Sequence, residues 1–137
     1  MTQHLQLLIA VLASACLLDC VRAEPSGTLF EHPEAKLSQE VVVRGYLIYD
    51  VENRNIFPTR DWNENWHEKK CIPIGIPSEN DALDEKAAKL TGRYVIVRGR
   101  MLQLVEDEQL NLSFCRRLGI RVDEIEPARL ERSGLGK

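Results

Sequence analysis

VVVRGYL at residues 41–47 and VIVRGRM at residues 95–101 are the two stretches that decide the fold of this chain. Each is rich in β-branched residues, which favour a β-strand, and each contains a glycine, Gly45 or Gly99. A glycine inside such a run is typical of a bulge or a sharp bend, and a bent strand can serve two sides of a barrel. One short internal similarity is too little evidence for a repeat protein, so we interpret the two stretches as two strands that bend for the same geometric reason.

Around these two stretches, the pattern of apolar and turn-forming residues predicts three more strands and one helix. The expected strands cover residues 41–49, 55–58, 71–76, 93–102 and 112–125, with a polar loop at residues 59–70. The helix is expected over Asn80–Leu90, where the leucines and Ala87 recur on one face. Ser78 with Asp81 resembles a capping box at its start, and Gly92 stands where a helix would end.

The resulting order of three strands, one helix and two strands is that of the OB-fold, a five-stranded barrel. The stretches that carry this likeness are residues 41–47 with Gly45, CIPI at 71–74, LTGRYVIVRG at 90–99 and IRVDEI at 120–125. In these stretches the chain resembles small bacterial exported OB-fold-like proteins of largely unassigned function. The resemblance implies a mainly β fold, a five-stranded OB-like barrel with one helix between strands 3 and 4. It implies no catalytic residues.

The first 23 residues are typical of a secretory leader, because a nearly unbroken apolar run extends from Leu5 to Leu18 and Ala23 precedes a suitable cleavage point. Two alternatives stay open. Cys16 could carry a lipid, or the run could be retained as a membrane anchor, although it stops at Asp19 after roughly 14 apolar residues where a span needs about 20. We therefore expect an exported protein, periplasmic or secreted, with a lipid-anchored envelope protein as the alternative.

Four segments follow from these patterns: a leader at 1–23, a lead-in at 24–39, the barrel domain at 40–126 and a charged tail at 127–137. The lead-in is polar and contains three Pro or Gly residues, so we expect it to be extended, with one helical turn near Glu34–Leu37. The mature chain is long enough for one compact domain and too short for two.

The charge of the chain bears on its partners. The full chain has a formal net charge of −3, and removal of the leader takes away one acid, Asp19, and one base, Arg22. An acidic domain without a block of Lys or Arg lacks the overall basic footprint of a nucleic-acid binder. We therefore expect the partner to be another envelope or secreted protein, with nucleic acid disfavoured and membrane contact only through a lipidated Cys16. The oligomeric state does not follow from the sequence.

Cys71 and Cys115 are the two cysteines that remain after the leader is removed. An even pair in an oxidising compartment predicts a disulfide, and closing a loop of this length would stabilise the fold by roughly 4 kcal/mol. Two buried free thiols are the alternative. A metal or redox pair is disfavoured because the two cysteines do not form a CxxC motif.

The densest group of chemically interesting side chains is DWNENWHE at residues 61–68, which holds Trp62, Trp66 and His67. Its Asp and Asn spacing imitates the start of an EF-hand loop, but Trp66 stands where that loop needs Gly and Ile72 where it needs Glu. We therefore predict no metal and no cofactor. An exposed indole could stack on a base, a sugar or a partner's side chain. Alternatively, one of the tryptophans could close an open end of the barrel.

Four further residues, Tyr46, Tyr94, Arg44 and Arg98, could form a second binding platform on the barrel wall. The chain contains no nucleophile elbow, P-loop, HExxH or GxGxxG motif, so an enzyme is disfavoured. The favoured function is a non-catalytic binding or interaction module of the cell envelope. The alternatives are a small-ligand or single-stranded nucleic-acid binder that uses the barrel face, and a small hydrolytic enzyme.

Overall fold

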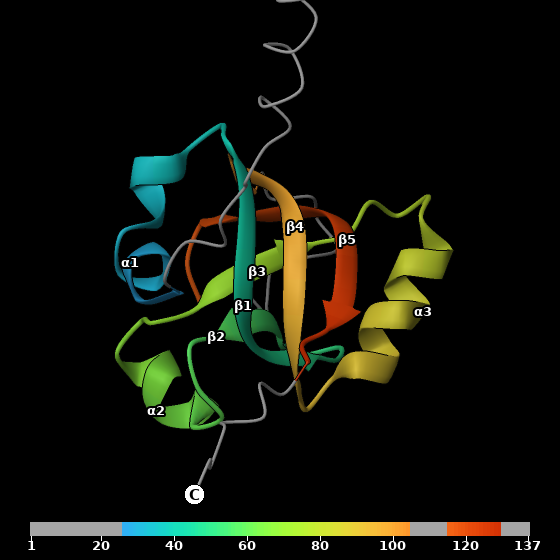
Figure 1. Ribbon diagram of the computed structural model, residues 1–137, viewed down its shortest axis with the longest axis horizontal. Coiled ribbons are helices and arrows are strands. Elements are labelled where there is room, and N and C mark those ends of the chain that lie inside the picture. Colours follow the sequence, from blue (N-terminus) through green and yellow to red (C-terminus); the bar gives the residue numbers. More distant parts are fainter. Residues whose placement is uncertain (1–25, 105–114, 130–137) are drawn as a thin grey trace, which may run out of the picture.

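The computed structural model describes residues 26–104 and 115–129 (Figure 1). The predicted leader, the candidate lipid site at Cys16 and the tail from residue 130 lie outside these ranges. Within the two described ranges, no helix is both long enough and apolar enough to cross a membrane.

Five strands close into a barrel around a single core (Figure 1). They are β1 (Glu40–Tyr49), β2 (Arg54–Phe57), β3 (Ile72–Gly75), β4 (Arg93–Gln103) and β5 (Leu118–Pro127). Neighbouring strands follow the order β1-β2-β3-β5-β4, and β4 returns to pair with β1. β3 and β5 are parallel, and the other pairs are antiparallel. With helix α3 (Asp81–Leu90) between β3 and β4 in the chain, the predicted fold class is confirmed.

Alternate residues of each strand face into the barrel. Most of these inward-facing residues are aliphatic, so the interior is an aliphatic core. In β1 the buried and less buried positions alternate, so that Arg44, Tyr46 and Ile48 lie on the outer face. Leu47 and Ile56 are paired across β1 and β2 and are both fully buried in the core. The other fully buried core residues of the strands are Val43, Ile72, Ile74, Val95, Val97, Met101, Ile120 and Ile125.

Gly45 and Gly99 both allow neighbouring strands to approach closely. A Cβ atom on Gly45 would lie 2.5 Å from the carbonyl oxygen of Phe57 and 2.6 Å from Cγ1 of Ile56. One on Gly99 would overlap the carbonyl oxygen of Arg121, and the register between β4 and β5 shifts between Arg98 and Gly99. The shift leaves one extra residue, Asp123, in β5 opposite Gly99, whereas β1 and β4 stay in register with each other through both Gly45 and Gly99. The irregularity therefore lies in β5 and not in the glycine-containing strands where the sequence suggested a bulge.

Helix α3 presents the predicted apolar face, since Leu83, Ala87 and Leu90 are buried in the same cluster as the barrel core. The predicted capping box of Ser78 and Asp81 is wrong. Asn80 caps the helix instead, and its side-chain oxygen accepts a hydrogen bond of 3.1 Å from the backbone N–H of Leu83. An Asn immediately before the first helical residue satisfies this otherwise unpaired N–H directly.

Two segments expected to be irregular contain short helices. The lead-in holds α1 (Ser26–Glu31) before a 3-10 turn, η1 (Pro33–Lys36), so only the helical turn near its end was predicted correctly. Leu29 and Phe30 are buried, which explains why this segment folds onto the barrel. The loop at 59–70 contains α2 (Trp62–His67), which packs against β2.

The last strand begins later than expected. Residues 115–117 are not part of a strand, and β5 runs from Leu118 to Pro127. Residues 112–114 of the predicted strand lie outside the described residues.

Candidate binding pocket beside helix α2

An open pocket of about 460 Å³ lies between α2 and the turn that joins β1 to β2. It brings together three of the predicted site residues, Trp62, Trp66 and His67. The other lining residues are Ile48 at the end of β1, Asp50, Glu52 and Asn53 in the turn, and Asn63 in α2. The pocket is therefore on the outer face of the barrel.

The turn at residues 50–53 is held by its own backbone and by one carboxylate. Oδ1 of Asp50 accepts hydrogen bonds from the N–H groups of Glu52 (2.8 Å) and Asn53 (2.7 Å). The N–H of Asp50 donates to the carbonyl oxygen of Asn53 at 2.8 Å. Such an Asx turn fixes the backbone at low cost. Val51 at the tip is 88% exposed.

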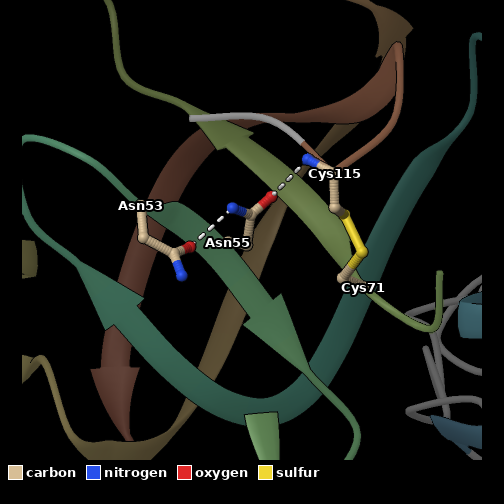
Figure 2. The surroundings of a disulfide bond; sticks show 4 residues. All are labelled: Asn53, Asn55, Cys71 and Cys115. Carbon is tan, nitrogen blue, oxygen red and sulfur yellow. Dashed lines mark hydrogen bonds between the residues drawn. A yellow bond between two sulfur atoms is a disulfide. The ribbon is translucent and has the colours of Figure 1, made fainter. Parts of the chain in front are cut away.

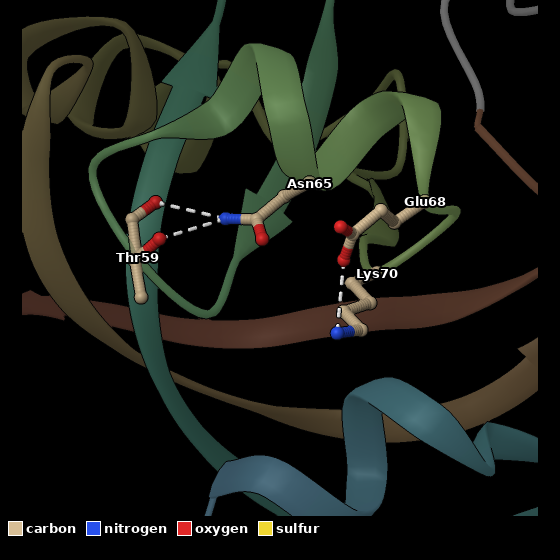
Figure 3. A network of polar contacts seen from close by, with 4 residues as sticks. All are labelled: Thr59, Asn65, Glu68 and Lys70. Atoms are coloured by element: carbon tan, nitrogen blue, oxygen red, sulfur yellow. Dashed lines mark hydrogen bonds and ion pairs between the residues drawn. The ribbon is translucent and has the colours of Figure 1, made fainter.

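One buried side chain ties helix α2 to the barrel (Figure 3). Nδ2 of Asn65 donates to Oγ1 of Thr59 at 2.8 Å, just after the end of β2. In the segment that follows the helix, the Lys70 ammonium pairs with the Glu68 carboxylate at 2.9 Å, and both side chains are partly exposed. The amide of Asn65, one of the groups that imitate an EF-hand ligand, is therefore used to position the helix.

The two indoles lie outside the barrel core. Trp62 is 39% exposed and tilts against Phe57 with 6.1 Å between ring centroids, while Trp66 is half-buried. Phe57 is opposite Tyr46 in the β1–β2 pairing, a position on the outer face, and it is fully buried there. The tryptophans thus cover the outside of β2 rather than an end of the barrel. This position favours the binding interpretation over the barrel plug.

Cys71 and Cys115 form the predicted disulfide, with 6.4 Å between their Cα atoms. A chain of amides leads from it towards the pocket (Figure 2). The N–H of Cys115 donates to Oδ1 of Asn55 at 3.4 Å, and Nδ2 of Asn55 donates to Oδ1 of Asn53 at 2.6 Å. Asn55 is fully buried and Asn53 is 9% exposed. The disulfide therefore lies behind the wall of the pocket.

Negative charge gathers around the pocket. Asp50 and Glu52 line it from the turn. Along α2, a hydrogen bond and the charge of Asp61, together with the charge of Glu68, raise the pKa of Glu64 above its ordinary value. Carboxylates affect one another's protonation in this way only when they are close together.

The second predicted group lies on the outer face of β1 and β4. Tyr46 and Tyr94 are paired across the strands, with ring centroids 5.4 Å apart and edge to face. The Arg44 guanidinium is 5.2 Å from the centroid of the Tyr94 ring. The Tyr94 hydroxyl accepts a hydrogen bond of 3.1 Å from the N–H of Arg60, and Arg98 is paired with Glu124 at 3.5 Å. These four side chains are thus largely engaged with their neighbours.

Sequence reasoning missed the residues that the turn contributes. The spacing of Asp50 and Asn53 after a strand is a recognisable Asx-turn signal, and it could have indicated a rigid turn. Nothing in the sequence indicates that this turn faces residues 62–67. In the part of the chain that the structure describes, no three His, Cys, Asp or Glu side chains are grouped so that they could hold a metal ion.

The described geometry therefore brings two indoles, two carboxylates, two amides and one imidazole to a single pocket between a turn and a helix. Comparison of the chain with protein-family models gives no match, and comparison with curated proteins gives no match either.

Proposed function

We propose that this protein is an exported, non-catalytic binding module that holds a partner protein of the cell envelope or of the secreted fraction through the pocket beside α2. One observation carries the proposal. Both tryptophans of the chain line this pocket and remain partly exposed, although the barrel core is filled without them. Trp is enriched among the residues that dominate binding energy in protein interfaces.

The construction of the pocket supports the same function. Its walls are a turn held by three short hydrogen bonds and a helix held to the barrel by Asn65. A partner that binds to a preorganised surface loses less conformational entropy than one that must order flexible loops.

Site-specific photo-crosslinking in living cells tests the proposal. A photoreactive residue replaces Asn63, an exposed side chain in the pocket, and the control carries it in place of Glu85 on α3, on the other side of the barrel (Figure 1). We expect the photoreactive residue at position 63 to form one discrete protein adduct and the residue at position 85 not to form this adduct. The adduct from position 63 should disappear when the Trp66→Ala substitution is added. Equal labelling from both positions, or no adduct from position 63, would contradict the proposal.

A second candidate is a small-ligand or single-stranded nucleic-acid binder that uses the face with Arg44, Tyr46 and Tyr94. The observation in its favour is the group formed by the Arg44 guanidinium over the Tyr94 ring and the edge-to-face contact of Tyr94 with Tyr46. The neighbouring acids on β5 oppose it, since Arg98 is already paired with Glu124. Binding of an oligonucleotide that persists above about 0.2 M salt would favour this candidate over the first.

A further inference from the structure

We propose that the pocket beside α2 binds a cationic side chain, Arg or Lys, of the partner polypeptide, and that Nδ2 of Asn53 donates a hydrogen bond to a main-chain carbonyl of the same segment. This inference rests on the proposed function and specifies the chemistry of its ligand. Three features of the described residues carry it: the charge of the lining, the two indoles and the orientation of the Asn53 amide.

The charge of the lining is suited to a cation. Asp50 and Glu52 contribute two carboxylates, and His67 is the one lining side chain that can carry a positive charge. Within the described residues, the carboxylate of Glu52 makes no hydrogen bond or ion pair. Of the nearby basic side chains, Arg54 lies over the Tyr49 ring at 4.9 Å and donates from Nε to the Asp50 carbonyl oxygen at 3.4 Å, and Lys70 pairs with Glu68; neither of the two lines the pocket. A bound cation would therefore supply the charge that the lining lacks.

The indoles make the preference more specific. The face of Trp attracts guanidinium and ammonium groups more strongly than that of any other side chain, because of its quadrupole. Trp62 and Trp66 are one helical turn apart in α2, and both line the same pocket. Two indoles with two carboxylates bind a cation more favourably than a neutral or anionic group of the same size.

The orientation of the Asn53 amide follows from the disulfide side of the pocket wall (Figure 2). The N–H of Cys115 can only donate, so Asn55 must present Oδ1 to it and Nδ2 to Asn53. Asn53 must then accept with Oδ1, which leaves its Nδ2 on the side away from Asn55. Asn53 is 9% exposed and lines the pocket, and no hydrogen bond from this Nδ2 to the described residues is present. A ligand with a carbonyl acceptor beside its cation satisfies this donor.

The test uses the two indole N–H signals in a nitrogen-correlated NMR spectrum, because the chain contains two tryptophans and both lie in the pocket. The probes are acetyl-Gly-Arg-Gly-amide and its citrulline analogue, which has nearly the same shape but no charge. We expect the Arg peptide to shift both signals and to bind at least tenfold more tightly than the citrulline peptide. Equal binding of the two peptides, or shifts with methyl glucoside but not with the Arg peptide, would overturn the inference.

A matched pair of variants tests the carboxylate. Glu52→Gln removes a charge from the pocket, and Glu85→Gln removes the same charge from the exposed face of α3. We expect Glu52→Gln to weaken binding of the Arg peptide roughly threefold to fivefold, as removal of a partly exposed ion pair does, and Glu85→Gln to leave it unchanged. Equal effects of the two changes would mean that only the overall charge of the protein matters, which would contradict a specific site.

The donor role of Asn53 is tested with a ligand that lacks a carbonyl. Methylguanidinium carries the cation alone, so we expect it to bind more weakly than the Arg peptide. In Asn53→Asp the donor becomes an acceptor while Oδ1 can still accept from Asn55. In this variant the affinity for the Arg peptide, divided by the affinity for methylguanidinium, should therefore fall towards one. The negative charge that the substitution adds affects both affinities equally, because both probes are monocations, so it does not change the ratio. An unchanged ratio would remove Asn53 from the proposal.

The inference and the proposed function fail in different ways. If position 63 forms an adduct whose contact segment contains no Arg or Lys, the cation inference is wrong and the binding module stands. If the Arg peptide binds selectively but no protein adduct forms, the pocket chemistry stands and the proposed protein partner is wrong.

Discussion

At the scale of single residues, polar side chains hold the outer structure of this barrel together. Asp50 closes the β1–β2 turn, Asn65 fastens α2 and Asn55 connects the disulfide segment to the pocket wall. Among the described residues, every side-chain nitrogen or oxygen that is completely shielded from solvent has a hydrogen-bond partner. Each of these residues therefore positions backbone that apolar packing alone would leave free to move.

Tyr49 illustrates how such a contact depends on pH. Its hydroxyl donates a short hydrogen bond to Oδ1 of Asp84, and burial together with this bond raises the pKa of Tyr49 above its ordinary value. A raised pKa in the folded state means that the contribution to stability is complete below the unfolded value of about 10 and is lost as the pH rises further. We expect Tyr49→Phe to be less stable than the wild type at pH 7, and the difference to shrink above about pH 10. Urea unfolding at both pH values measures it, and a constant difference would contradict the assignment.

Alanine variants of Trp66 and Phe57 compare the stability cost of a position outside the core with that of a fully buried position. Because Trp66 is half-buried outside the core, Trp66→Ala should lower the free energy of unfolding by only about 1–2 kcal/mol. Phe57 is fully buried, so Phe57→Ala should cost about 3–5 kcal/mol. Chemical denaturation of the two variants checks the difference. A loss for Trp66→Ala as large as that for Phe57→Ala would restore the barrel-plug interpretation.

At the scale of elements, the α-helices α1, α2 and α3 perform different tasks around one barrel. α3 completes the core, α1 covers β1 with Leu29 and Phe30, and α2 supplies the pocket residues. α2 has six residues, too few to be stable alone, so its position depends on the Asn65 hydrogen bond and on the contact between Trp62 and Phe57. The pocket therefore exists only where the barrel holds this short helix.

The start of α3 can be tested directly. Asn80→Ala removes the acceptor for the Leu83 N–H and should destabilise the protein by about 1 kcal/mol. Ser78→Ala is the matched control, because Ser78 is exposed and its hydroxyl contacts only the neighbouring Glu79 among the described residues. Thermal melts of both variants give the comparison, and a larger effect of Ser78→Ala would support the capping box that the sequence suggested.

At the scale of the whole molecule, the disulfide connects the start of β3 to the segment before β5, across a sequence separation of 44 residues. Loss of this cross-link should reduce the stability of the domain by roughly 4 kcal/mol, because the unfolded chain gains the entropy of an open loop. A Cys71→Ser and Cys115→Ser double variant, compared with the wild type by urea unfolding, measures the loss. Intact mass should also rise by about 2 Da on reduction, since each thiol gains one hydrogen. Two thiols that alkylate freely in the untreated native protein would contradict the bond.

Much of the barrel was predictable because local pattern and tertiary role agree there. The β-branched runs before Gly45 and Gly99, the apolar face of α3 and the turn at Gly92, where φ is 77°, each fold as their own residues favour. The short helices were missed for the opposite reason. α1 packs on β1 with Phe30 buried, and Trp62 of α2 contacts Phe57 of β2; no local period reveals these contacts.

The sequence by itself indicated the order of strands and helix along the chain, because this depends on local propensity, and it favoured the pairing of Cys71 with Cys115 over two free thiols, because these are the two cysteines beyond the expected leader. It also identified Trp62, Trp66 and His67 as candidates, since aromatic and polar side chains are concentrated there. Only the tertiary structure placed Asp50, Glu52 and Asn53 in the same pocket as these residues and engaged Oδ1 of Asn53 with the Asn55 amide. The physical reason is that a site built from two separate segments depends on how the barrel closes, and this closure is a property of all five strands together.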